Sequence, residues 1–472
     1  MSASTAASHG PRVLLVKSWS NGDYPQVSPP IGLLSLAAVL RADLDAAVGL
    51  IDLRLTDRPE AELARVCAEF RPDVVGLSAL THESRGARLA AAVARRVDPR
   101  VRVILGGPHA SALGPSVLER LPEVDAALLG EGETGIGDLV RRLVAGESLE
   151  ALPGVAHRVD GRVCQPDAGR PVADLDALPT PAYDLVDFDD FARRPRFTRT
   201  GVGRYMTVMS SRGCPFGCIY CHNIFGRRYR VRSAASFVAE LELLHRRYGV
   251  REFEVVDDAF NLRRQRVIEI CRGIVDAGLD VRLSFPNGMR GDLLDEEQLQ
   301  WLRRAGTNYI AIAVETAAPR MQELIAKRMD LGRVRETVAA ARRLGIHMHG
   351  LFMLNLPGET LAEMQQTADF IVDSPLLSFN LGIATPFPGT QLAELARQRG
   401  VEPLEEPVDG FYGARFESMC EVPVDEINRL RRRTHLRFYL DPRRIWGLAR
   451  SLPARTLLDL PGIFLRRLRL GS

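Results

Sequence analysis

The sequence predicts an α/β protein with a doubly wound parallel sheet at the amino terminus, then a partial (β/α)6 barrel, then a helical carboxyl-terminal extension. Three observations lead to this fold class. Short apolar runs alternate with amphipathic stretches before residue 150 and again after residue 200, as parallel strands and crossover helices do. A proline-rich stretch separates the two alternations, and the last part of the chain is strongly basic. We therefore expect four segments in the 472 residues, namely 1–150, 151–200, 201–395 and 396–472.

The first alternation contains five apolar runs short enough to be buried strands. They are Val13–Val16, Val48–Asp52, Val74–Ser78, Val101–Leu105 and Ala126–Leu129, with amphipathic stretches such as Glu60–Phe70 and Arg85–Val97 between them. Several of these runs end in glycine or small polar residues, as the ligand-binding edge of a doubly wound sheet requires. Residues 151–200 are expected to be a linker with one short hairpin at Asp160-Gly161.

The second alternation contains six candidate strands, and about six β/α units suit an open barrel better than a closed one of eight. The strands are Met206–Ser210, Glu252–Val256, Val281–Phe285, Tyr309–Val314, His349–Met353 and Phe379–Ile383. Helices such as Ala234–Tyr248 and Arg263–Ala277 separate them. In this architecture chemistry takes place at the carboxyl ends of the strands, so the motifs found there carry the functional argument.

Bulk properties exclude several classes of protein. The formal net charge is +3, which does not indicate a nucleic-acid binder. The amino-terminal residues lack the pattern of a secretory signal, and no uncharged apolar run reaches the ~20 residues that span a bilayer, so a cytoplasmic location is expected. Seven cysteines in a chain of this length do not predict a disulfide framework. Lys17 and Lys327 are the only lysines, a bias that we attribute to base composition.

Three of the cysteines fall within eight residues, directly after the first expected barrel strand. Cys214, Cys218 and Cys221 have a Cys-x3-Cys-x2-Cys spacing in a loop shaped by glycine and proline. Thiolates favour soft metals and iron–sulfur clusters, and three thiolates on a four-iron cluster leave one iron open to a non-protein ligand. The alternatives are a haem-attachment motif ending at His222, which requires export, a structural zinc with His222 as fourth ligand, and a redox Cys-x-x-Cys pair, which leaves Cys214 without a role.

The cysteine motif, with the aromatic Tyr220 before its third cysteine, resembles that of radical SAM enzymes, and the resemblance covers most of the chain. It implies a [4Fe-4S] cluster on Cys214, Cys218 and Cys221 whose open iron binds S-adenosylmethionine (SAM). It further implies reductive cleavage of SAM to a 5′-deoxyadenosyl radical, with electrons from a donor such as flavodoxin or ferredoxin.

Three later segments match the family in order and supply candidate SAM contacts. Asp257 and Asp258 lie where the family places strand-end residues near the SAM amino group, although either aspartate is also a suitable helix cap. Arg290 falls where relatives carry a polar strand-end residue. Glu315 resembles the strand-end glutamate near SAM or substrate, and a salt bridge at the barrel rim is the alternative for this residue.

The first segment resembles the cobalamin-binding domain joined to many radical SAM enzymes. The resemblance rests on Ser28–Leu33, Gly76–Ser78, Leu105–His109 and Leu129–Glu133. It implies cobalamin contacts from Ser78, Gly106, Gly107, His109 and Glu131. The Asp-x-His-x-x-Gly motif that places a histidine on cobalt in some cobalamin proteins is missing from the sequence, so no protein histidine is expected on the metal. A degenerate domain that keeps the fold without the cofactor is the alternative.

Together these resemblances imply a cobalamin-dependent radical SAM methyltransferase that methylates an unactivated carbon of a small-molecule or lipid-like substrate. A cobalamin-dependent cyclase or rearrangement enzyme of tetrapyrrole or hopanoid type is the first alternative. A cobalamin or SAM sensor without turnover is the second, although a sensor has no need of a three-cysteine cluster site. Methylthiotransferases carry further cluster cysteines in the amino-terminal region, where this chain has only Cys67 and Cys164.

The carboxyl-terminal segment from Leu430 onward is basic and apolar, and it includes Arg431–Arg433, Arg443-Arg444 and Trp446. One interpretation is an amphipathic helix pair on an anionic membrane surface, which would place the protein peripherally at the inner membrane. The other is a helical cap that packs on the barrel and exposes an arginine face to solvent.

Overall fold

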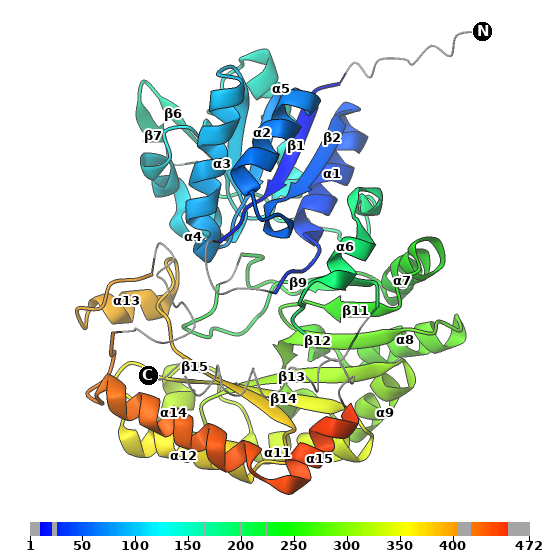
Figure 1. The fold of residues 1–472 in the computed structure, drawn as a ribbon, viewed down its shortest axis with the longest axis vertical. Helices are drawn as coiled ribbons and strands as arrows, with labels where there is room; N and C mark the ends of the chain where they lie inside the picture. The colour runs from blue at the N-terminus through cyan, green and yellow to red at the C-terminus, as the bar shows by residue number, and fades with distance from the viewer. Residues whose placement is uncertain are drawn as a thin grey trace.

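The computed structural model describes residues 10–20, 26–164, 166–198, 201, 203–222, 224–404 and 417–451. Two large sheets organise it, and the first lies above the second in Figure 1. The short strand β9 and the loops next to it lie between the two sheets. The expected functional loop is therefore placed at the junction of the two α/β units.

The first sheet has the order β2-β1-β3-β4-β5-β6-β7, and its first five strands run parallel. These are β1 (Arg12–Lys17), β2 (Ala47–Asp52), β3 (Val74–Ser78), β4 (Arg102–Gly106) and β5 (Ala126–Leu128). Each of the five predicted strands is present. Their carboxyl ends form one edge of the sheet, as in other parallel sheets that bind ligands.

Helices cover both faces of this sheet, because successive side chains of a strand point to opposite sides. Val16 of β1 packs in the core under α2, α3 and α4, whereas Leu15 packs in the core under α1 and α5. The arrangement confirms the doubly wound prediction. The helices are α1 (Ile31–Leu44), α2 (Pro59–Phe70), α3 (Ser84–Val97), α4 (Pro108–Leu113) and α5 (Ile136–Ala145).

Part of the stretch expected to be a linker extends the first sheet. β6 (Val155–Val159) and β7 (Arg162–Cys164) form the expected hairpin, and β6 pairs antiparallel with β5. Asp160 and Gly161 make its two-residue turn with φ of 49° and 77°, and positive φ at both positions matches the twist of the flanking strands. The chain then passes through α6 (Phe188–Arg193) to the barrel.

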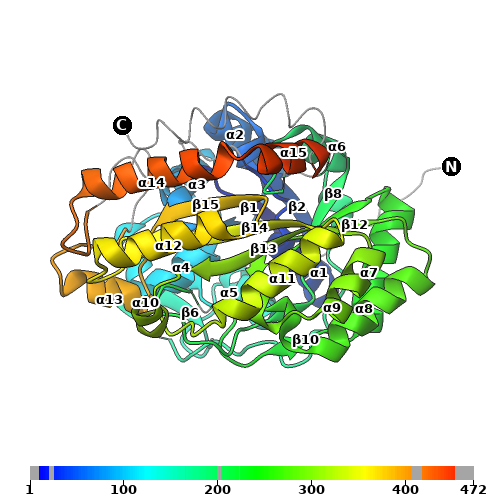
Figure 2. The same ribbon diagram turned by 90° about the horizontal axis from the view of Figure 1, so that it is seen from below.

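The second sheet has the order β8-β11-β12-β13-β14-β15 and is parallel throughout. β8 and β15 are its two ends, which confirms the open barrel of six strands. The strands are β8 (Tyr205–Val208), β11 (Glu252–Val255), β12 (Arg282–Met289), β13 (Thr307–Glu315), β14 (His347–Leu354) and β15 (Ser378–Ile383). Figure 2 shows the helices on the outer face, which are α7 (Ala234–Tyr248), α8 (Arg264–Asp276), α9 (Glu296–Arg304), α11 (Leu331–Arg343) and α12 (Leu361–Asp373). The short α10 (Pro319–Leu324) follows β13.

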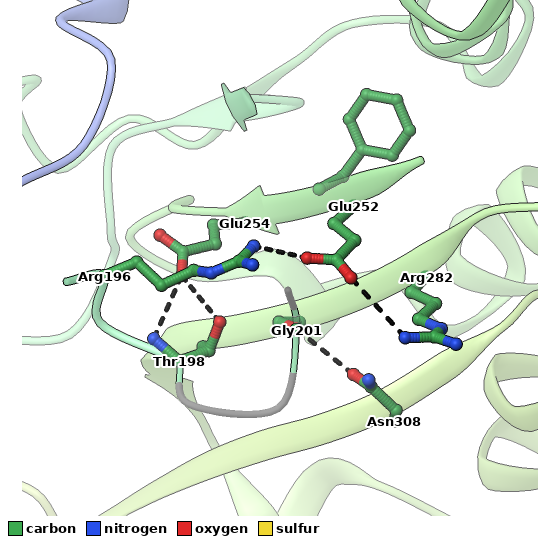
Figure 3. A pocket seen from close by; sticks show the side chains of 9 residues that line it. Arg196, Thr198, Gly201, Glu252, Glu254, Arg282 and Asn308 are labelled. Atoms are coloured by element: carbon green, nitrogen blue, oxygen red, sulfur yellow. Dashed lines mark hydrogen bonds and ion pairs between the residues drawn. The ribbon is translucent and has the colours of Figure 1, made fainter. Parts of the chain in front are cut away.

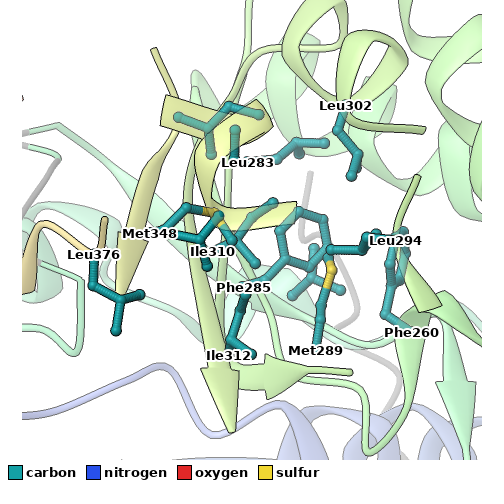
Figure 4. Packing of buried hydrophobic residues seen from close by; sticks show 14 of the residues in the cluster. Phe260, Leu283, Phe285, Met289, Leu294, Leu302, Ile310, Ile312, Met348 and Leu376 are labelled. Atoms are coloured by element: carbon teal, nitrogen blue, oxygen red, sulfur yellow. The ribbon is translucent and has the colours of Figure 1, made fainter. Parts of the chain in front are cut away.

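The largest hydrophobic core fills the space between the barrel strands and these helices. Figure 4 shows Phe285 of β12, Ile310 and Ile312 of β13 and Met348 of β14 packed together there. Since side chains alternate along a strand, the residues between them face the inside of the barrel. That alternation leaves the polar residues of the strands for the barrel interior and its rim.

The carboxyl-terminal extension is helical, as predicted, with α13 (Gln391–Arg397), α14 (Val424–Tyr439) and α15 (Pro442–Ser451). The ring of Phe438 in α14 lies 4.7 Å from that of Phe379 in β15, so α14 packs on the barrel as a cap. Residues 452–472, on which part of the tail prediction falls, lie outside the described residues. No helix in the described ranges is long and apolar enough to cross a membrane.

Candidate functional site

A two-stranded hairpin holds the cysteine loop at its neck. β9 (Ser211–Arg212) pairs antiparallel with β10 (Arg230–Val231), so the loop of residues 213–229 starts and ends at the same place. Gly213 enters the loop with φ of 82°, and a Cβ there would collide with the carbonyl of Arg228. Glycine is therefore required at the entry, and the three cysteines extend from a fixed base.

The cysteine loop carries three free thiols from Cys214, Cys218 and Cys221. Cys221 is accessible to solvent, but the protein atoms packed around it raise the pKa of its thiol to about 11. Burial likewise raises the pKa of the Cys214 thiol. Iron binds thiolates, so loading this loop with a cluster would release protons.

The donor set fits an iron–sulfur cluster in its chemistry. Three thiols lie within eight residues of one loop, and thiolates are the ordinary protein ligands of iron–sulfur clusters. Among the described residues, no group of three or more histidine, cysteine, aspartate or glutamate side chains is placed to hold a single metal ion. A [4Fe-4S] cluster does not require its protein ligands to converge on one ion, because each thiolate binds a different iron.

Tyr220, Glu315 and Lys327 form a buried triangle next to the cysteines. The Lys327 ammonium donates to the Tyr220 hydroxyl at 2.9 Å and to Glu315 Oε1 at 3.1 Å, and the Tyr220 hydroxyl donates to the same oxygen at 3.1 Å. Glu315 ends β13 with φ of 71°, an unusual conformation for a residue with a side chain, which costs about 1–3 kcal/mol. The structure thus brings together two of the predicted site residues and adds a lysine to them.

Adjacent aspartates at the end of β11 have different surroundings. Asp257 is buried and accepts hydrogen bonds from the Ser210 amide at 2.7 Å, the Ser210 hydroxyl at 2.6 Å and the Ser211 hydroxyl at 2.5 Å. Asp258 is accessible, and its carboxylate accepts from the Gly213 amide at 3.1 Å. Protein atoms packed against one side of the Asp258 carboxyl group shield it from water and raise its pKa to about 6. Asp257 therefore fastens the end of β8, whereas Asp258 faces the entry of the cysteine loop.

Arg290 is also at the cysteine loop, held from three sides. Its guanidinium lies 4.3 Å from the ring centre of Phe216, which is inside the loop. It donates to Asp292 at 3.0 and 2.6 Å and to the Lys327 carbonyl at 2.9 Å. Arg290 therefore supports the loop and the lysine of the buried triangle.

In the first domain, four of the five predicted cobalamin contacts (Ser78, Gly106, Gly107 and His109) gather at the carboxyl edge of β3 and β4. Gly106 ends β4, and Gly107 follows with φ of 87°. A Cβ on Gly107 would lie 2.8 Å from the Ser78 hydroxyl, so a side chain would fill the space beside that hydroxyl. His109 is only 4% exposed, and its amide donates to the Ala79 carbonyl at 3.0 Å. Two successive glycines leave the backbone here without side chains, which fits the close approach of the flat face or nucleotide tail of a cobalamin.

Glu131 belongs to a buried ion cluster between the two domains. Its Oε2 accepts from Arg212 at 2.9 Å and from Arg230 at 3.0 Å. Glu133 accepts from Arg212 at 2.6 Å and from the Ser35 hydroxyl at 2.8 Å. Although burial acts in the opposite direction, the Arg212 guanidinium lowers the pKa of Glu133. We call Glu131, Glu133, Arg212 and Arg230 the interdomain ion cluster.

A polar pocket lies at the amino-terminal ends of the barrel strands, away from the cysteines (Figure 3). There Arg196 pairs with Glu252, and the Thr198 hydroxyl donates to Glu254 at 2.6 Å. These contacts join the segment before β8 to the start of β11. In barrels of this kind the amino-terminal face contributes to stability, whereas chemistry takes place at the opposite face.

Sequence reasoning missed four residues that the structure places around the candidate site. Lys327 had a signal, since it is one of two lysines in a chain that otherwise uses arginine. Glu133 lies in the Leu129–Glu133 segment that resembles the cobalamin-binding domain, but nothing there indicated its partner, and Arg212 and Arg230 had no signal because their partners lie far away in the sequence. Arg212 and Arg230 are 81 and 99 residues from Glu131.

Comparisons with known proteins agree with the two-domain arrangement. Residues 208–371 match the radical SAM superfamily, and residues 21–140 match the B12 binding domain. An uncharacterized methyltransferase of Pyrococcus horikoshii is 30% identical over 429 residues, which cover 88% of each chain. The cytidylyl-2-hydroxyethylphosphonate methyltransferase of Streptomyces wedmorensis is 28% identical and covers 81% of this chain and 80% of its own.

A solved structure shows the same fold at lower identity. The radical SAM methyltransferase TsrM from Kitasatospora setae, with cobalamin and a [4Fe-4S] cluster bound, has a TM-score of 0.67 at 22% identity. The match covers 83% of this chain and 78% of that chain.

Fold, cysteine loop and comparisons together define a radical SAM enzyme. More narrowly, the chain belongs to the radical SAM family with a cobalamin-binding domain, whose relatives named above are methyltransferases. The cofactors expected from the sequence, a [4Fe-4S] cluster, SAM and cobalamin, are those of this family.

Proposed function

We propose that this enzyme methylates an unactivated carbon of a small-molecule or lipid-like substrate. The observation that supports this most directly is the contact between the cysteine loop and the first domain. Arg212 and Arg230, at the neck of that loop, bond to Glu131 after β5. The regions that would hold the two cofactors therefore face each other, as methyl transfer between them requires.

Cys214, Cys218 and Cys221 would hold the cluster, and their number leaves one iron for the amino and carboxylate groups of SAM. When bound, the cluster supplies the electron that breaks a C–S bond of SAM, and cobalamin supplies the methyl group. Asp258 is the accessible carboxylate at the loop entry and is suited to bind the SAM ammonium.

The remaining site residues would orient these groups. Glu315 and Lys327 fix the Tyr220 hydroxyl from two sides, and Tyr220 precedes the third cysteine. Arg290 fixes the loop through the ring of Phe216. Packing of this kind also keeps water from the site, which radical chemistry requires.

In the first domain, Ser78, Gly106 and Gly107 would contact cobalamin at the open strand edge. The glycine backbone allows close approach of a flat macrocycle, and the Ser78 hydroxyl is available as a hydrogen-bond partner beside it. His109 is buried and hydrogen-bonded through its amide to Ala79 after β3, so it would support this edge rather than bind cobalt. Glu131 would act through the arginines of the cysteine loop.

A cyclase is the second candidate, because three relatives carry that name. The anaerobic magnesium-protoporphyrin IX monomethyl ester cyclase of Rubrivivax gelatinosus is 27% identical over 77% of this chain. SAM labelled in its methyl group separates the two activities, since only a methyltransferase puts the label into the product. A sensor without turnover would form no 5′-deoxyadenosine when reduced.

The first experiment is to measure iron and cobalt after anaerobic reconstitution with iron, sulfide and hydroxocobalamin. One cluster and one corrinoid correspond to roughly four irons and one cobalt per chain. Cys218→Ala should lose SAM cleavage and keep cobalamin binding, whereas Cys164→Ala, outside the loop, should keep both. Iron without cobalt in the wild-type protein would reject methyl transfer from cobalamin, and cleavage retained in Cys218→Ala would reject the cluster assignment.

We also propose that a reduced flavodoxin or ferredoxin supplies the electron.

We further propose that the enzyme is cytoplasmic and contacts the inner membrane through α14 and α15. At the junction of these helices Leu440 and Ile445 are 65% and 53% exposed, next to the exposed Arg437 and Arg443. Apolar side chains among arginines suit an anionic bilayer surface. The protein should float with anionic vesicles and not with zwitterionic ones. Flotation should be lost in Leu440→Ser/Ile445→Ser and kept in Val144→Ser on α5, and no flotation of the wild-type protein would refute the contact.

A further inference from the structure

The interdomain ion cluster includes one arginine from each of the two strands at the neck of the cysteine loop, β9 and β10. Arg212 in β9 and Arg230 in β10 are direct partners in the antiparallel pair. Glu131 accepts from both arginines at 2.9 and 3.0 Å, and Glu133 accepts from Arg212 at 2.6 Å. One short loop of the first domain thus reaches the start and the end of the loop that carries the cysteines.

The same two arginines also hold the loop itself. Arg230 donates to the Phe225 carbonyl at 2.8 Å, and the Arg212 guanidinium lies 5.1 Å from the Phe225 ring centre. The Cys214 amide donates to the Gly226 carbonyl at 3.2 Å. Whatever fixes the two arginines therefore fixes the backbone on both sides of the three cysteines.

The interdomain ion cluster is buried and balanced in charge. The exposed fractions of the side chains are 2% for Glu131, 6% for Glu133, 11% for Arg212 and 5% for Arg230. Two carboxylates face two guanidiniums, so removal of one carboxylate leaves a buried positive charge without compensation. Because water has little access, salt screens these interactions poorly.

We propose that Glu131 and Glu133 are positioning residues that set the place of the cysteine loop, and of the cluster it would carry, under the carboxyl edge of the first sheet. The geometric part concerns the protein without cofactors, and only the catalytic consequence rests on the proposed function. Other contacts keep the domains together. Tyr205 of the barrel donates to the Val27 carbonyl at 2.5 Å, and Gly389 lies against Ala112 of α4. Neutralising Glu131 therefore loosens the loop without separating the domains.

Amide hydrogen exchange of the cofactor-free protein tests the geometric part. In Glu131→Gln, peptides within residues 213–229 should exchange about tenfold faster than in wild type, because the loop opens more often. Glu133→Gln should have a smaller effect, since Arg212 still bonds to Glu131. The matched control is Glu252→Gln, which removes a buried carboxylate from its pair with Arg196 at the opposite end of the barrel. Unchanged exchange of residues 213–229 in Glu131→Gln, or in Glu133→Gln if the first variant fails to fold, overturns the proposal.

Reconstituted protein then separates positioning from general damage. Cobalamin binding should weaken less than methyl transfer in Glu131→Gln, since Ser78, Gly106 and Gly107 at the ends of β3 and β4 are unchanged. Methyl transfer from SAM to reduced cobalamin should fall about tenfold more than 5′-deoxyadenosine formation, because only the first reaction depends on the distance between the domains. Equal losses in both reactions would contradict a positioning role. A wild-type protein that forms neither product would reject the proposed function and leave the exchange result in force.

Discussion

Replacing Lys327 with methionine should destabilise the barrel more than any exposed charge substitution nearby. The ammonium lies 3.1 Å from Glu315 Oε1, and the two side chains are 7% and 10% exposed. At that distance and an effective dielectric constant of ~20, the attraction between unit charges is about 5 kcal/mol. Loss of one partner of a buried pair costs roughly 3–5 kcal/mol, because the other charge stays buried. We expect a loss in that range, reduced slightly by the Tyr220 hydroxyl, which still donates to Glu315.

Unfolding by guanidinium chloride at pH 7.5, followed by the fluorescence of Trp301, measures the change in the free energy of unfolding. Trp301 lies in α9 of the barrel, and replacing Trp19 and Trp446 with phenylalanine makes it the sole reporter. The matched control is Arg328→Met, one residue further along. Arg328 pairs with Glu323 at 2.7 Å, but these side chains are 72% and 64% exposed, so the control should lose less than about 1 kcal/mol.

A double-mutant cycle decides whether the buried pair explains the loss. Lys327→Met/Glu315→Gln removes both charges, so it should be more stable than Lys327→Met alone. If the double variant is less stable than wild type by the sum of the two single losses, the two residues are not coupled. A loss below about 1 kcal/mol in Lys327→Met would likewise refute the reasoning, since it is the value for a solvated pair.

Three further outcomes follow from buried groups of the barrel. Lys327→Arg should lower the free energy of unfolding by about 1–3 kcal/mol although the charge is kept, because the planar guanidinium does not fit the space of an ammonium between Tyr220 and Glu315. Unfolding by guanidinium chloride measures this loss. Burial raises the pKa of Glu359 from 4.5 to about 7, so stability is lost as the pH rises through this window, by about 3 kcal/mol. Unfolding between pH 4 and 8 should show this slope in wild type and not in Glu359→Gln, and equal slopes would contradict it. Burial lowers the pKa of His347 from 6.5 to about 4. The stability that the neutral imidazole contributes is therefore complete above pH 6.5 and falls by about 3 kcal/mol toward pH 4. A His347→Gln variant should lack that acid-side loss in the same titration.

Much of the fold was accessible from the sequence because its determinants are local. Val74–Ser78 is a short apolar run followed by an amphipathic stretch, and this local pattern predicts a buried strand without knowledge of its pairing partners. The turn at Asp160-Gly161 was recognisable because few residue pairs accept positive φ. The pairing of β6 with β5 was not recognisable, because the apolar pattern of a strand does not indicate which other strand it pairs with.

The candidate site was accessible only where its residues lie close in the sequence. The three cysteines are recognisable from their spacing. Asp257 and Asp258 are adjacent identical residues, and they differ only in the direction that the chain after β11 gives each side chain. Glu131 was expected at the cofactor, and the structure places its carboxylate on Arg212 and Arg230, 81 and 99 residues away. A partner at such a separation leaves no local trace, so its identity depends on how the two domains dock.

The two lysines give this chain a built-in chemical reporter. Both lysine residues are 7% exposed and paired with a glutamate, so amine-reactive reagents and lysine-specific proteases have little access to them in the native state. Lys17 ends β1 of the first sheet, whereas Lys327 lies beside the barrel after α10. Labelling or cleavage at one lysine before the other would therefore show which of the two domains opens first, in the wild-type chain and without any introduced probe.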